Sequence, residues 1–384
     1  MQTLIYNATL VLAERLIEDG WLLIEDTKIG GLGEAATCPA IIERRIDAGG
    51  NFVLPGLIDL HCDAIEKLVE PRPNVHFEVS LALAEADLRL AGCGITTEFH
   101  AVSLDDREFG VRAVNFIVDF AQAIQAQSNS LIRHEIHARL EVTSVKGFEM
   151  ISGLIKARAV RLVSLMDHSP GQGQYTTEEA YREYVKRTAH MSDAEIDEIL
   201  EMKREQAAHV PGRIEAVAKL VREAGLALAT HDDDDPAKVE QWPGLGVTIA
   251  EFPTTIEAAR RAHELGLAVC MGAPNVVRGK SSGGNLSATA AIEAGVADTL
   301  CADYYPSAML TAIFRLAKQN IMSLPQATRT VTLNPAKAVG LGSERGSLEV
   351  GKLADLIVVA LNGQNIPGVQ RVFVGGAEKL TVTA

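Results

Sequence analysis

Histidine and acidic side chains gather at the ends of apolar, strand-like runs, and they carry the clearest chemical signal in the chain. The first run covers residues 54–60 and is followed directly by His61, Cys62 and Asp63. Because alternate residues of a strand face the same way, His61 and Asp63 should project together. Later runs end in a similar way, which adds these candidates: His137, Arg139, Glu141, Asp167, His168, His231, Asp232, Glu251 and Asp303.

This pattern predicts a metal centre. A buried ionisable group is costly unless it is paired or binds a cation. One histidine at a strand end is more often structural, but repetition over several strand ends favours a shared function. Imidazole and carboxylate ligands together suit Zn²⁺ and related divalent ions, and two ions about 3.5–4 Å apart with a bridging carboxylate would use this many ligands. We therefore expect His61 and Asp63 to bind a cation.

The elements that must position these residues read as a barrel. Apolar runs alternate with stretches of helical spacing, and eight such β/α units over roughly 250 residues predict an α/β fold of the (β/α)8 TIM-barrel type. Active sites of that fold lie at the carboxyl ends of the strands. The eight runs cover residues 56–63, 94–102, 134–142, 160–168, 226–232, 246–253, 267–274 and 298–306.

The two ends of the chain have a different character. Short β-rich runs separated by Gly and Asp turns predict a small β-sandwich-like domain assembled from residues 1–53 and 341–384, with the catalytic barrel at 54–340. The connection after the fourth strand is exceptionally long. Its helical text, at about 169–225, predicts an insertion or lid at the active face, with a Ser192–Glu195 capping box.

Composition narrows the class of protein. The formal net charge of -14 over 384 residues argues against nonspecific binding to nucleic acid or to anionic membranes. An anionic substrate stays open, because a local metal or arginine cluster can invert the field. Five scattered cysteines without a CxxC pair favour a reducing compartment. With no signal peptide and no apolar run near the roughly 20 residues of a membrane helix, we expect a soluble, cytoplasmic protein.

Several stretches resemble a known family. The β-domain from both termini, "LPGLIDLH" on the first strand and an aspartate on the last resemble the amidohydrolase superfamily, although that family usually has His-x-His where this chain has His-x-Asp. A narrower resemblance is to its phosphonate-pathway branch, the α-D-ribose 1-methylphosphonate 5-triphosphate diphosphatases. The stretches that carry it are "PGLIDLHCD", "PRPNVHF", "LVSLMDHSPGQ", "HDD", "AEFPTTIEAAR", "MGAPNVVRG", "SSGGN" and "ADYYP".

The resemblance implies a reaction and partners. Such an enzyme releases pyrophosphate from a polyanionic sugar phosphonate triphosphate, leaves the 5-phosphate, and serves the carbon–phosphorus lyase route of phosphonate use. Proteins of that route would be pathway partners, and we expect a homodimer.

The resemblance also implies a ligand set. His61 and Asp63 would hold one ion, with Asp303 as a further ligand or neighbour, and His168 and His231 would hold the second. Glu141 is expected to bridge them, since the fourth strand lacks the carboxylated lysine of many relatives. The alternative for Glu141 is an ion pair with an arginine. Two Zn²⁺ ions per chain are expected, with Mn²⁺ or Fe²⁺ as alternatives.

Roles for other residues follow. Asp303 is expected to be catalytic, taking the proton of the attacking water, and Asp232 or Asp233 to orient His231 from behind. Basic and polar residues of the barrel loops are expected to bind the substrate, although each taken alone is at least as often a surface or turn residue. They are Lys67, Arg72, Arg139, Gln172, Arg278, Lys280, Ser281 and Asn285.

Two other functions stay open. An amide or cyclic-amide hydrolase, of the dihydroorotase or N-acetylglucosamine 6-phosphate deacetylase type, would use the same barrel and metals with fewer basic donors. A non-catalytic scaffold of the same superfamily should lack His61 or Asp303, and this chain keeps both.

Overall fold

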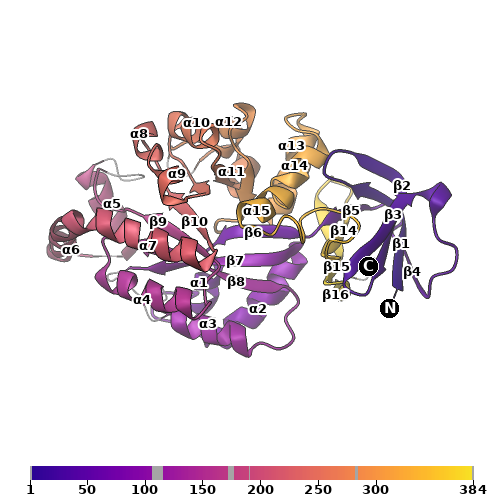
Figure 1. The fold of residues 1–384 in the computed structure, drawn as a ribbon, viewed down its shortest axis with the longest axis horizontal. Helices are drawn as coiled ribbons and strands as arrows, with labels where there is room; N and C mark the ends of the chain where they lie inside the picture. Colours follow the sequence, from indigo (N-terminus) through magenta and orange to yellow (C-terminus); the bar gives the residue numbers. More distant parts are fainter. Residues whose placement is uncertain (1, 106–115, 172–176, 190, 282–283, 383–384) are drawn as a thin grey trace.

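Two eight-stranded sheets organise the chain (Figure 1). The structure, a computed structural model, describes residues 2–105, 116–171, 177–189, 191–281 and 284–382. One sheet forms a parallel barrel surrounded by helices, and the other is built from both ends of the chain. The predicted fold class, a TIM barrel with a small terminal β-domain, is confirmed.

The barrel contains all eight predicted strands in chain order, each parallel to the next. The last strand returns to the first through a single parallel bridge between Cys62 and Asp303. Apolar side chains such as Leu60, Phe99 and Ile249 fill the interior. The strands are β6 (Leu57–Cys62), β7 (Ile95–Leu104), β8 (Arg133–Glu141), β9 (Leu162–Met166), β10 (Ala227–His231), β11 (Ile249–Glu251), β12 (Ala268–Gly272) and β13 (Thr299–Cys301).

Helices cover the outside of the barrel with their apolar faces. In α10, for example, Thr255 caps the first turn by accepting a hydrogen bond from the Ala258 amide, and Ala258 and Ala262 are buried one turn apart. The helices are α1 (Ala64–Val69), α2 (Val79–Gly92), α3 (Phe116–Ala126), α4 (Val145–Lys156), α5 (Glu178–Ala189), α6 (Asp193–Gln206), α7 (Val210–Ala224), α8 (Pro236–Val239), α9 (Trp242–Leu245), α10 (Ile256–Glu264), α11 (Ala273–Arg278), α12 (Ala288–Glu293), α13 (Ala308–Lys318), α14 (Leu324–Arg329) and α15 (Leu333–Ala338). Within the described residues, none combines the length and hydrophobicity that crossing a bilayer requires.

The small sheet joins the two ends of the chain. Strand β14 pairs antiparallel with β5, and β5 lies beside β1, so the termini meet in one domain (Figure 1). Gly56 then leads from β5 into β6, and a Cβ there would lie 2.2 Å from Thr96 Oγ1, so only glycine fits. The strands are β1 (Gln2–Val11), β2 (Leu16–Glu25), β3 (Lys28–Glu34), β4 (Arg44–Asp47), β5 (Phe52–Pro55), β14 (Leu356–Leu361), β15 (Pro367–Val374) and β16 (Ala377–Thr381).

Among the described residues, three α-helices lie between β9 and β10. Helix α7 packs against α4 and β10 like the other barrel helices, whereas α5 and α6 form an added pair. That pair has a small core of its own, which includes Tyr181 and Ile196. The predicted capping box at Ser192 and Glu195 is present and begins α6. The sequence-based domain boundaries and the lid function stay predictions.

Candidate metal centre

Histidines from separate strands meet at the carboxyl end of the barrel. His61 lies near the end of β6, His137 lies on β8, and His231 ends β10. The ring centroid of His61 is 5.2 Å from that of His137 and 5.6 Å from that of His231. His168, two residues beyond β9, lies 6.1 Å from His231 between ring centroids. The strand-end pattern of the sequence therefore corresponds to one site.

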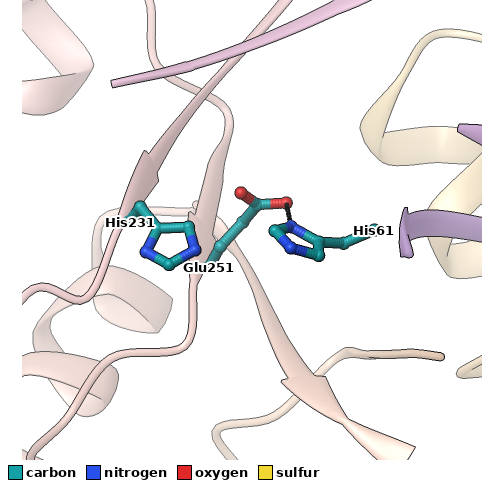
Figure 2. A group of neighbouring side chains, drawn as sticks. All are labelled: His61, His231 and Glu251. Carbon is teal, nitrogen blue, oxygen red and sulfur yellow. Dashed lines mark hydrogen bonds and ion pairs between the residues drawn. The ribbon is translucent and has the colours of Figure 1, made fainter. Parts of the chain in front are cut away.

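A buried carboxylate lies between the rings of His61 and His231 (Figure 2). Glu251 ends β11 and is fully buried, and its Oε1 lies 3.4 Å from His61 Nδ1. Ligand atoms of His61, His231 and Glu251 all lie within 4.8 Å of one another. The sequence marks Glu251 as an acidic strand end but gives it no role. Its position at a strand terminus is the signal that could have found it.

His137 presents a free lone pair to the same group. Its Nδ1 lies 2.9 Å from the carbonyl oxygen of Leu60, which can only accept, so the proton is on Nδ1. Its Nε2 lies 3.6 Å from Glu251 Oε2. Burial lowers the pKa of His137 to about 3, which keeps the ring neutral. A neutral imidazole oriented by a backbone carbonyl is the usual form of a metal-binding histidine.

A second group lies next to the first. Ligand atoms of His168, His231 and Asp232 lie within 4.8 Å of one another, and Asp232 Oδ2 is 3.2 Å from His231 Nδ1. Burial alone would raise the pKa of Asp232, but the neighbouring His231 and His168 lower it overall. Asp233 turns away and accepts a hydrogen bond from Trp242 Nε1 at 3.0 Å. Of the two aspartates expected behind His231, the structure places Asp232 there.

Glu141 forms an ion pair with a lysine that is not among the residues expected at the site. Its Oε1 accepts hydrogen bonds from Lys203 Nζ at 2.8 Å and from Thr143 Oγ1 at 2.7 Å. Its Oε2 lies 3.2 Å from His168 Nδ1. Burial would raise the pKa of Glu141, but Lys203 and His168 hold it well below its usual range. The alternative role for Glu141 was an ion pair with an arginine, whereas its partner in the structure is Lys203 from α6.

Asp303 closes the site where the last strand meets the first. Its amide donates to the carbonyl oxygen of His61 at 2.8 Å, and the Asp63 amide donates to the Asp303 carbonyl oxygen at 2.9 Å. Burial and the charge of Asp63 raise the pKa of Asp303 to about 6, against the opposing effects of Arg139 and His231. Two backbone hydrogen bonds thus join Asp303 to His61 and to Asp63.

Left-handed backbone occurs after three of these strands. Asp232, Phe252 and Asp303 have φ values of 59°, 50° and 56°, and each follows a barrel strand within two residues. Such conformations cost about 1–3 kcal/mol each and cluster at functional sites. The Phe252 ring also packs edge-on against His61 and His231, with centroids 4.9 Å and 5.3 Å apart. Phe252 therefore shields two of the histidines.

The expected substrate residues fall into two groups. Arg139 is buried on β8, 8% exposed, and its Nε has no hydrogen-bond partner among the described residues. Arg278 is exposed at the end of α11 and donates to the Tyr304 hydroxyl at 3.3 Å. Gln172 lies outside the described residues. The remaining residues are exposed or half-buried, and the structure brings none of them into the histidine cluster: Lys67, Arg72, Lys280, Ser281 and Asn285.

Comparison with known proteins identifies the family. The amidohydrolase family profile matches residues 52–384. The α-D-ribose 1-methylphosphonate 5-triphosphate diphosphatase of Escherichia coli K12 is 38% identical over 362 residues, covering 92% of this chain and 94% of that protein. An imidazolonepropionase of Pseudomonas aeruginosa is 25% identical over 370 residues, covering 89% and 87%.

Solved structures share the fold at lower identity. The N-acetylglucosamine-6-phosphate deacetylase of Pasteurella multocida superposes with a TM-score of 0.63 at 14% identity, covering 98% of this chain and 99% of that one. A Xaa-Pro dipeptidase gives 0.67 at 16% identity, covering 98% and 99%. The resemblance read from the sequence motifs is confirmed, and the chain belongs to the amidohydrolase family.

Proposed function

We propose that this hydrolase converts α-D-ribose 1-methylphosphonate 5-triphosphate to the 5-phosphate and pyrophosphate during phosphonate breakdown. The observation that carries the proposal is the 38% identity to the Escherichia coli diphosphatase over 92% of the chain. The buried histidine and carboxylate cluster supplies the chemical groups that a metal-dependent hydrolase needs. We also propose a cytoplasmic location, and a homodimer and contacts with carbon–phosphorus lyase proteins stay predictions.

The donor set fits divalent metal. Among the described residues, His231 Nε2 and Glu251 Oε2 are buried without a hydrogen-bond partner, which is costly unless a cation or proton binds there. We propose two ions, most simply Zn²⁺ with Mn²⁺ or Fe²⁺ as alternatives, held by a set that Glu251 extends. Bound divalent ions would polarise the phosphoryl oxygens and lower the pKa of a water molecule. The proposed ligands are His61, Asp63, Glu141, His168, His231 and Asp303, with Glu251 added.

Glu141 could bind a metal ion with little movement of its side chain. Its Oε2 already lies beside His168 Nδ1, so a cation placed between them would replace that contact. Lys203 stays on Oε1 and holds the carboxylate ionised and in place. This arrangement keeps Glu141 as the proposed bridge.

Proton transfer falls to Asp303. The Asp303 carboxylate follows the last strand and lies beside His61 and Asp63, where it can take the proton of an attacking water. Its left-handed backbone and its contacts across the barrel fix the direction of the carboxylate. The same group can then return the proton to the leaving pyrophosphate.

The negative charges of the substrate would be bound in two places, at the centre of the site and outside it. Arg139 is the buried cation beside Asp303 and Asp232, and it lowers the pKa of both, so it can contact a phosphoryl group at the centre. Exposed and half-buried residues outside the histidine cluster would hold the outer phosphates and the phosphonate. They are Lys67, Arg72, Arg278, Lys280, Ser281 and Asn285, with Gln172 as a further prediction.

One assay tests the proposal. Pyrophosphate release from ribose 1-methylphosphonate 5-triphosphate is measured together with metal content on the same sample. Release by protein that carries about two ions per chain supports the reaction and the cofactor together. If fully metallated protein releases none, the proposed reaction is wrong, and the amide or cyclic-amide hydrolase alternative becomes the working function. Phosphorylated N-acyl sugars and cyclic amides are then the compounds to test.

A further inference from the structure

Two buried carboxyl groups face each other on the outer side of the barrel sheet, away from the candidate metal centre. Asp59 of β6 and Glu98 of β7 are direct partners in the strand register, and both have 0% exposure. Their chain neighbours Leu60 and Phe99 belong to the inner core of the barrel. Because successive residues of a strand point to opposite faces, Asp59 and Glu98 point outward.

Asp59 connects the first and last strands of the barrel. Its Oδ1 accepts hydrogen bonds from the amide of His61 at 3.2 Å and from the amide of Ala302 at 2.9 Å. Strands β6 and β13 stand at opposite ends of the sheet order, so few other bonds join them at this junction, which we call the barrel seam. Ala302 directly precedes Asp303. One carboxylate thus fixes backbone next to His61 and next to Asp303.

Glu98 has no comparable partners. Among the described residues, neither Glu98 oxygen has a hydrogen-bond partner, and neither does Asp59 Oδ2. Two facing carboxylates cannot both stay ionised in the protein interior without a cation, so a proton or a metal ion must lie between them. The two amides favour negative charge on Asp59. Burial, helped by the charge of Asp59, raises the pKa of Glu98 well above its usual range.

A third polar group lies beside the pair. Ligand atoms of Asp59, Cys62 and Glu98 lie within 4.8 Å of one another, a spacing at which a metal ion is conceivable. Two backbone amides already occupy Asp59 Oδ1, and one proton shared between Asp59 Oδ2 and Glu98 leaves neither carboxyl as an unpaired buried charge. The shared proton is the simpler arrangement, and a bound ion is an outcome of the test.

We propose that Asp59 is a positioning residue of the active site: its carboxylate fixes the backbone on both sides of the barrel seam, while Glu98, as a neutral acid, donates a hydrogen bond to it. The inference rests on the proposed metal centre but not on the identity of the substrate. It predicts that changes at this outward-facing pair alter metal binding although neither residue touches the metal.

The test compares two double variants of the full chain. In Asp59→Asn/Glu98→Gln, side-chain amides keep an acceptor for the His61 and Ala302 amides and a donor between the pair. In Asp59→Leu/Glu98→Met, both carboxyls are removed together, so no unpaired buried charge opposes folding, but the two backbone amides lose their acceptor. Affinity for Zn²⁺ and for Mn²⁺ is measured by competition with a chromophoric chelator, and urea unfolding is recorded on the same samples.

We expect the amide variant to bind metal within about twofold of wild type and the apolar variant to bind 10–100-fold more weakly while still folded, the range seen for residues that orient metal ligands. A merely structural role would change the unfolding midpoint but not the affinity of the folded protein, and that result overturns the inference. If the apolar variant does not fold, Asp59→Ala is measured in its place, at a urea concentration low enough to leave it folded. The same loss of metal affinity is expected.

Two further outcomes count against the proposal. If wild type holds one more ion per chain than the amide variant, the pair binds a metal instead of a proton, and the inference is wrong. If wild type binds neither metal, the proposed metal centre fails and the inference with it. The two failures can be told apart: unchanged metal affinity in the apolar variant overturns the inference about Asp59 but leaves the proposed metal centre standing.

Discussion

Replacing Lys203 by methionine is the sharpest perturbation of the candidate site, because it removes one half of a buried ion pair. Lys203 Nζ lies 2.8 Å from Glu141 Oε1, with 8% and 0% of the two side chains exposed. Removing one partner of such a pair typically costs about 3–5 kcal/mol, since the other charge stays buried. Thr143 and His168 still contact the carboxylate. We therefore expect about 3 kcal/mol, at the lower end of that range.

Urea unfolding of the metal-free protein at pH 7 measures this loss. The chain has two tryptophans. A Trp21→Phe background leaves Trp242 as the one reporter, buried in the barrel beside Asp233. The control is Lys203→Met/Glu141→Gln, in which both charges are gone and most of the lost stability should return. A loss below about 1 kcal/mol, or no recovery in the double variant, would refute the reasoning.

The pH dependence gives a second check on the same pair. The folded protein holds the pKa of Glu141 below its unfolded value, so the pair stabilises the fold above about pH 4.3, and this stability is lost as the pH falls further. The pKa of Lys203 is raised, so its contribution is lost only as the pH rises above about 10.4. The difference between wild type and Lys203→Met should thus be largest between these limits. A difference that grows from pH 7 down to pH 4 would contradict the assignment.

Three other predictions test the remaining roles. Asp303→Asn should abolish turnover of the metal-loaded enzyme. The pKa of Asp303 is raised to about 6 in the metal-free protein, so the same change should stabilise the metal-free protein against urea at pH 8. This gain in stability should vanish below about pH 4. Activity close to wild type would remove Asp303 from the mechanism. Glu141→Ala should lower the metal content, measured by atomic absorption, to one ion per chain or none, and two retained ions would mean that another residue bridges them. Arg278→Ala should weaken binding of a ribose 5-triphosphate far more than of the 5-monophosphate, and equal losses would place Arg278 away from the polyphosphate.

The strand ends of the barrel were predictable because each combines two signals in one short stretch. An apolar run such as residues 226–229 identifies a buried strand, and a polar residue such as His231 at its carboxyl end, repeated over several strands, indicates a shared site. The fold class followed from counting these units. Glu251 also stood at a strand end, but its chain neighbours do not indicate that it faces two histidines from other strands.

Other parts of the site depend on tertiary contacts. Lys203 lies in "EMKREQ", a stretch of α6 whose many charges resemble a solvated helix face, and its burial arises only when α6 packs against the end of β8. Strict alternation would place Asp59 on the same face as His61. A register shift between Asp59 and Cys62 instead lets Asp59 point outward beside Glu98, and sequence periodicity does not reveal that shift. A β-domain built from the two ends of the chain was predictable. The pairing of β5 with β14 was not, because it joins residues about 300 positions apart.

That pairing has a consequence for biosynthesis. The strand that carries His61 is continuous, through Gly56, with a sheet whose strands β14, β15 and β16 are made about 300 residues later than β5. While the ribosome is still translating the barrel, β5 therefore presents an unpaired edge, and edges of that kind invite association with other chains. A nascent chain stalled before β14 should aggregate or engage chaperones, even though nearly every residue proposed for chemistry has already been made. Completion of the terminal sheet, more than completion of the barrel, would then set the moment at which this protein becomes a stable enzyme.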